Sequence, residues 1–281
     1  MHEPEVGNDL IDPTFSAADL TMAAGGSLRP EVIALQENHL TFFKNSIPAG
    51  PITDPDSKNK PRRWAECTGL GEQLPDASMN RQNLLDLAAD LRVSVSVVCW
   101  SILAWGGMHG RHRDAINKQP DTKWLDLAGK IRAGEYSRSQ AYEAFSKLKD
   151  GGNLKGMGPA YWTKLIFFLM PRSVASKPIG FIMDQWVGCA INLLSDRQIV
   201  LMNYSWVWGR SKRNVVVPSV SFVVSDVNTS DRYEEYCRYI EKTALEIERP
   251  PHETELLLMS DGGRNKQPWR QYIIRSRLPP S

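Results

Sequence analysis

The chain has 281 residues, enough for one large domain or two closely associated lobes with an apolar core. Its 34 Lys and Arg residues against 32 Asp and Glu residues leave a formal charge of +2, which excludes a strongly basic nucleic-acid-binding chain and requires any such site to be local. Hydrophobic residues make up 42% and charged residues 23%, which excludes a disordered or fibrous protein.

Targeting signals are not apparent in the sequence. The N-terminus carries acidic residues early and lacks the basic and apolar segments of a secretory signal. The apolar stretches are shorter than the ~20 residues that span a bilayer. We therefore expect a cytoplasmic protein, monomeric and without a membrane partner. The four cysteines are too widely spaced for an Fe–S cluster or a metal site, and we expect reduced thiols: Cys67, Cys99, Cys189 and Cys237.

Hydrophobic periodicity divides the chain into three regions. Residues 1–78 form an N-terminal arm, a helix over 31–46 and a proline-rich connection. Residues 79–194 are helical throughout, with N-caps at Asn80 and Ser137 and a glycine-rich turn over 105–113. In residues 195–281, an aromatic segment over 198–224 could be a small hairpin or an irregular insertion, and two helices and a basic tail follow it.

The strongest local motif is LKGMGP, at residues 154–159, between two helical patterns. Gly156 and Gly158 allow a tight turn between antiparallel helices, and Pro159 suits the first turn of the second helix. The free N–H groups of such a turn can hold a phosphate without a charged side chain. The motif is equally compatible with a turn that only joins two packed helices.

An aspartate follows this hairpin after one helix and a loop. Asp184 lies 184 − 158 = 26 residues after the second glycine, at the predicted start of a helix. The sequence allows it to be a plain N-cap, a catalytic carboxylate, or both.

Together, LKGMGPAYWTKLIFFL and IMDQW resemble the helix-hairpin-helix DNA glycosylase superfamily, and most closely its 8-oxoguanine-glycosylase-like branch, over residues 94–194. The resemblance implies an all-α fold with two helical lobes, a DNA cleft between them, and the helix-hairpin-helix at about 137–170. It further implies that Lys155, Gly156, Met157 and Gly158 bind a phosphate and, through backbone carbonyls, a monovalent Na⁺ or K⁺. Asp184 would be the catalytic carboxylate, which stabilises positive charge on the sugar and activates water.

The chain departs from the family at one position. Bifunctional members carry a Schiff-base lysine two residues after the second hairpin glycine, where this chain has Ala160. This predicts a monofunctional enzyme that leaves an abasic site. Lys164 lies one helical turn further on the same face, however, and could supply a displaced nucleophile or contact a phosphate.

Two further groups could serve base flipping. The turn over 105–113 could fill the gap in the duplex or contact the orphaned base through Met108, His109, Arg111, His112 and Arg113. The flipped base could stack on aromatic residues: Trp162, Trp186, Tyr204, Trp206 and Trp208. Ordinary core or surface roles are possible for each, and Trp100 and Trp124 are expected in the core.

The expected function is therefore removal of a modified base from double-stranded DNA. The substrate would be an oxidised purine or, because the 198–224 segment could enlarge the pocket, a hypermodified phage cytosine such as glucosylated hydroxymethylcytosine, in antiviral defence. The alternatives are a bifunctional glycosylase/lyase using Lys164, a non-catalytic DNA-binding hairpin module, and a helical adaptor that does not bind DNA.

Overall fold

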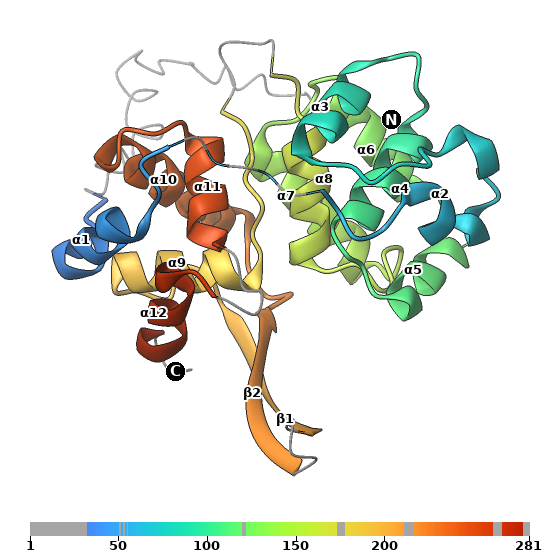
Figure 1. Ribbon diagram of the computed structural model, residues 1–281. Coiled ribbons are helices and arrows are strands. Elements are labelled where there is room, and N and C mark those ends of the chain that lie inside the picture. The colour runs from blue at the N-terminus through green and yellow to red at the C-terminus, as the bar shows by residue number, and fades with distance from the viewer. Residues whose placement is uncertain are drawn as a thin grey trace, which may run out of the picture. The chain divides into compact units, whose positions relative to one another are not determined.

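A computed structural model describes residues 33–50, 52, 54, 56–119, 122–172, 178–210, 216–260 and 266–277, with the backbone alone for 206–210 and 216–220. Within them, the chain is mainly helical, and one two-stranded hairpin projects from the helices (Figure 1), which confirms the predicted all-α class. The α-helices are α1 (Glu37–Ser46), α2 (Pro61–Trp64), α3 (Arg81–Ala89), α4 (Val95–Trp105), α5 (Gly110–Asn117), α6 (Lys123–Arg132), α7 (Arg138–Asp150), α8 (Pro159–Leu169), α9 (Gln185–Ser195), α10 (Ser230–Glu246), α11 (Pro251–Met259) and α12 (Pro268–Ser276). The 3-10 helices are η1 (Glu66–Thr68) and η2 (Gly71–Gln73), and the strands are β1 (Met202–Arg210) and β2 (Val216–Val224).

Predicted caps fix the ends of several helices. Asn80 and Ser137 each form a capping box at the start of α3 and α7, and Thr229 accepts the Arg232 N–H at the start of α10. Gly134 follows α6 with a φ of +78°, the left-handed conformation expected after a helix end. Local side-chain chemistry therefore sets these boundaries.

The helices pack in two groups (Figure 1). Helix α8 contacts α3, α4, α6 and α7, and is buried on nearly every face. Helix α9 contacts α1, α10, α11 and α12. Trp100 and Trp124, predicted to be core residues, are 4% and 2% exposed and pack edge to face in the first group. Residues 1–30, predicted as a loose arm, lie outside the described residues.

Three predicted boundaries are wrong. The helix expected over 31–46 begins only at Glu37, because the Gln36 N–H donates to the Leu194 carbonyl instead. The turn expected over 105–113 ends at His109, whose Nδ1 accepts the Arg111 N–H and starts α5. Part of the basic tail forms α12, because Trp269 and Ile273 bury one face of it.

The aromatic segment over 198–224 contains a β-hairpin, one of the two alternatives that the sequence left open. Strands β1 and β2 pair antiparallel from Met202 opposite Val224 to Arg210 opposite Val216. The base of the hairpin packs on α9, where a Cβ on Gly188 would lie 2.4 Å from Cε of Met202. The hairpin base therefore lies against the helix that Asp184 begins.

Candidate active site and nucleic-acid interface

Asp184 is held at the start of α9 by an anchored, extended segment. The Tyr233 hydroxyl donates to the Phe181 carbonyl at 2.9 Å, and the Met183 N–H donates to Thr163 Oγ1 at 3.1 Å. Oδ1 of Asp184 accepts the N–H groups of Trp186 and Val187 at 2.7 and 2.9 Å, which confirms the predicted N-cap. Among the described residues, Oδ2 has no hydrogen-bond donor. The half-buried carboxylate is thus oriented through one oxygen and available through the other.

The Lys164 side chain extends along α8 toward the turn at residues 154–159. Its Nζ donates to the Ala160 carbonyl at 2.6 Å and lies 5.3 Å from the centre of the Tyr161 ring. Helical side chains lean toward the N-terminus, so the amine lies one turn before its own Cα. In this conformation the stem of Lys164 occupies the space beside Gly106, where a Cβ would lie 2.7 Å from Cδ of Lys164.

Charged neighbours couple Lys164 to Asp184. Burial lowers the pKa of the Lys164 amine, while the negative charges of Asp184 and Glu255 oppose that shift. The structure therefore brings the two predicted catalytic residues within electrostatic reach of each other. It also adds two residues that the sequence did not indicate, Glu255 and its partner Arg81.

Arg81 and Glu255 form a buried ion pair between α3 and α11. Both Glu255 oxygens accept guanidinium N–H groups, the Nη2–Oε1 contact being 3.3 Å. Glu255 is fully buried, and the guanidinium lies 5.6 Å from the Trp105 ring centre and 5.2 Å from that of Phe167. No motif marks these residues: Arg81 merely follows a cap, and Glu255 falls in an apolar helix pattern.

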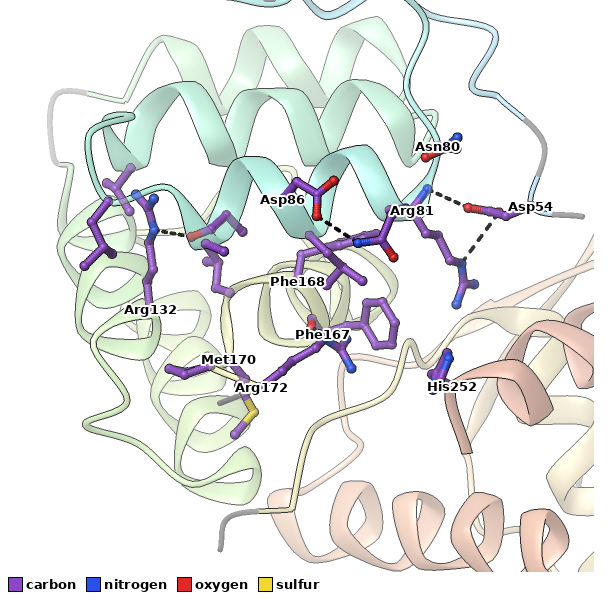
Figure 2. A pocket seen from close by; sticks show the side chains of 18 of the residues that line it. Asp54, Asn80, Arg81, Asp86, Arg132, Phe167, Phe168, Met170, Arg172 and His252 are labelled. Atoms are coloured by element: carbon purple, nitrogen blue, oxygen red, sulfur yellow. Dashed lines mark hydrogen bonds and ion pairs between the residues drawn. The ribbon is translucent and has the colours of Figure 1, made fainter. Parts of the chain in front are cut away.

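A cavity of about 1230 Å³, partly lined by Arg81, lies between α3, α6, the end of α8 and the start of α11. Figure 2 shows several of its lining side chains. Its wall includes Arg172, whose guanidinium lies 4.6 Å from the Phe167 ring centre, and His252, whose pKa is lowered by burial and by Arg172. The lining contains none of the residues predicted to hold the base. Arg81 lines this cavity and also interacts electrostatically with Asp184.

The turn at residues 154–159, between α7 and α8, has the geometry of an anion site. Gly156 has a φ of +80°, and extended Gly158 begins α8. Among the described residues, the N–H groups of Gly156, Met157 and Gly158 have no acceptor. The side chain of Gln119, which follows α5, makes two hydrogen bonds to the backbone of Lys155. Its Oε1 accepts the Lys155 N–H at 3.2 Å, and its Nε2 donates to the Lys155 carbonyl at 3.3 Å. The turn is therefore rigid and offers free donors.

Replacing Gly156 by alanine is expected to weaken DNA binding about tenfold or more, because the turn would lose both its left-handed φ and its close approach to α5. A Cβ there would lie 2.9 Å from the His112 carbonyl oxygen. Gly152, also at positive φ but with open space around its Cβ position, is the matched control. Titration of labelled duplex measures the effect; equal losses at both glycines would contradict a specific role of the turn.

The turn at 105–109 and helix α5 lie beside this hairpin. The His112 ring lies 6.4 Å from the Tyr161 ring at the start of α8. His109 and Arg111 are exposed, whereas Met108 is a core residue with 2% exposure. Arg113 is engaged internally, donating to the Trp64 carbonyl at 2.7 Å. Of the side chains predicted to contact DNA from this turn, His109 and Arg111 are therefore the exposed ones.

The predicted aromatic wall divides into core and surface residues. Trp162 is fully buried between Tyr142 and Phe145 and has no surface for a base. One face of Trp186 carries the Arg270 guanidinium at 3.7 Å. The side chains of Trp206 and Trp208 lie outside the described part.

Aromatic packing continues from Trp186 to the base of the β1–β2 hairpin. Phe222 lies edge to face with Trp186 at 5.0 Å and 6.2 Å from Tyr204, and the Arg277 guanidinium lies over it at 4.3 Å. Arg270 and Arg277 belong to the segment that the sequence predicts as a basic tail. Helix α12 instead brings cations onto the aromatic residues next to Asp184.

Within the described residues, no group of His, Cys, Asp or Glu could hold a metal. Burial raises the pKa of three thiols to about 12, those of Cys99, Cys189 and Cys237, while Cys67 is exposed. No described helix is long and apolar enough to cross a membrane.

Residues 53–259 match the family model described as "putative 8-oxoguanine DNA glycosylase OGG-like protein". The match includes the hairpin, Lys164, Asp184, Arg81 and Glu255, and ends before α12. No curated protein and no solved structure matches the chain.

Proposed function

Because the chain belongs to the OGG-like family of DNA glycosylases, we propose that it excises an oxidised purine from DNA with Lys164 as the attacking amine and Asp184 as the stabilising carboxylate. The observation that carries this proposal is the position of Lys164 Nζ at the Ala160 carbonyl. The family resemblance puts the Schiff-base lysine at residue 160. The amine thus reaches the first turn of α8 although its Cα is one turn away.

In the proposed reaction, the neutral Lys164 amine attacks C1′ of the flipped nucleotide. The N-glycosidic bond breaks, and its electron pair leaves with the base, which takes up a proton. The Asp184 carboxylate stabilises the positive charge that develops on the sugar. Transfer of the amine proton to O4′ opens the ring and leaves a protonated imine. Loss of a C2′ proton then expels the 3′ phosphate with the C3′–O electron pair.

The family description supports an oxidised purine as substrate and lends no support to the phage cytosine or an antiviral role. The wall for the flipped base would come from the region around Asp184. Trp186 and Tyr204 line the adjoining aromatic cluster, and Arg270 would add a cationic face.

The competing route uses water, activated by the free Oδ2 of Asp184, and leaves an intact abasic site. Ala160 at the usual lysine position favours this route, and a single experiment separates the two. Borohydride reduces an imine between enzyme and DNA to a stable adduct, whereas water attack forms no such bond.

We expect borohydride to trap wild-type protein on duplex containing 8-oxoguanine, and Lys164→Gln to form no adduct. Lys130→Gln, which changes an exposed lysine on α6, should form the adduct normally. The trapping rate should rise with pH and level off below 10.5, since burial lowers the pKa of Lys164 and extends its neutral form to lower pH. Base release by wild type without any adduct would establish the water route.

A further inference from the structure

The family resemblance implies a monovalent cation on the hairpin carbonyls, but on this chain those carbonyls are engaged by side chains. Lys149 Nζ donates to the Met157 carbonyl at 3.2 Å. Gln119 Nε2 donates to the Lys155 carbonyl at 3.3 Å. The backbone of His112 lies close to the turn between them, where a Cβ on Gly156 would be 2.9 Å from the His112 carbonyl oxygen. The carbonyls of Lys155 and Met157 therefore each accept a hydrogen bond from a side chain.

Lys149 is placed differently from an ordinary surface lysine. It lies in the last turn of α7, the first helix of the hairpin, with its side chain 28% exposed, whereas Lys147 is 74% exposed and pairs with Glu143 on the same helix. Lys149 Nζ also lies 3.4 Å from Oδ2 of Asp226. One ammonium thus joins α7, the hairpin turn and the loop before α10.

A metal ion does not fit this arrangement. A cation on the Met157 carbonyl would lie beside the Lys149 ammonium, and two positive charges repel strongly where they are partly buried. The ammonium already supplies what the ion would supply, a positive charge held on the turn carbonyls. Both groups prefer oxygen partners at similar distances.

We propose that the Lys149 ammonium takes the place of the monovalent cation in this hairpin and binds a DNA backbone phosphate. It has three N–H donors, of which one meets Met157 and one points to Asp226. The third can meet a phosphate held by the free amides of Gly156 to Gly158. This inference rests on the DNA substrate of the proposed function. It adds that the Lys149 ammonium replaces the monovalent cation.

The Asp226 carboxylate weakens phosphate binding at the same site. A Cβ on Gly158 would lie 3.0 Å from its Oδ1, so the carboxylate lies close to the hairpin amides. An arriving phosphate competes with this carboxylate for the ammonium and is repelled by it. Asp226 therefore lowers the affinity for DNA and favours release.

The test measures binding of a duplex with a tetrahydrofuran abasic analogue by fluorescence anisotropy, in KCl, NaCl, LiCl and tetramethylammonium chloride at equal ionic strength. Tetramethylammonium is too large to lie among the carbonyls. Wild-type affinity should agree within about twofold in all four salts, because the binding cation is part of the chain. Loss of affinity in tetramethylammonium chloride relative to KCl would overturn the proposal.

Three variants sharpen the test. Lys149→Met should bind about tenfold more weakly, and Lys147→Met should change affinity by less than about twofold. Asp226→Asn should bind about threefold more tightly. Wild-type affinity in Lys149→Met would overturn the proposal.

The salt slope separates a phosphate contact from a purely structural role of Lys149. Losing one ion contact should reduce the slope of log affinity against log salt by about 0.9. An unchanged slope in Lys149→Met overturns the phosphate contact even if affinity falls. The outcome is distinct from that of the proposed function, because borohydride adducts report Lys164 and do not depend on which salt is present.

Discussion

Asp184→Asn is expected to lower base excision by about 10³-fold while the protein folds normally. The asparagine oxygen can still accept the Trp186 and Val187 N–H groups, so the cap of α9 is retained. It carries no negative charge, however, and cannot stabilise positive charge on the sugar. Single-turnover release of 8-oxoguanine from duplex DNA measures the loss, and thermal denaturation monitors the fold.

Two further variants separate charge from capping. Asp184→Ala should lose the same activity and also about 1 kcal/mol of stability, because the cap is removed. Asp196→Asn, at the opposite end of α9, should keep full activity. Full activity in Asp184→Asn would reduce Asp184 to a cap and contradict its catalytic assignment.

Breaking the Arg81–Glu255 pair is expected to cost about 3–5 kcal/mol of unfolding free energy, because either single change leaves an uncompensated charge away from water. Side-chain exposure is 8% for Arg81 and zero for Glu255. Urea denaturation of Arg81→Met and Glu255→Gln measures the loss.

The double variant Arg81→Met/Glu255→Leu is the decisive comparison. Removing both charges leaves neither one unpaired, so most of the lost stability should return. If the double variant is as unstable as the sum of the single ones, the two residues act independently and the pair is not the cause.

Local chemistry predicted much of the helical framework from sequence. Ser137 and Asp184 were recognised as caps because a short polar side chain before an apolar period has a direct backbone consequence. The sequence does not predict helix α12, because its two arginines, Arg270 and Arg275, and the Arg277 that follows them suggest a solvated tail. Arg270 in fact packs on Trp186, an aromatic residue far from it in sequence.

The site was predictable only where a motif carries it. Gly156, Gly158 and Asp184 stand at recognisable spacings, so their places followed from the turn and the helix between them. Arg81 and Glu255 are 174 residues apart, and nothing local distinguishes a buried charge from an exposed one before its partner is known. Trp162 illustrates the converse, since an aromatic residue near a motif can simply be core.

The reach of Lys164 has a consequence for how such enzymes diverge. A helical turn rises about 5.4 Å, roughly the length of an extended lysine side chain. Under the proposed role of Lys164, the amine reaches the backbone of residue 160 from a Cα one turn further on, and Gly106 leaves room for the lysine stem. Under the proposed mechanism, a catalytic amine persists although the sequence signature is broken, and Gly106 is the residue that leaves room for it.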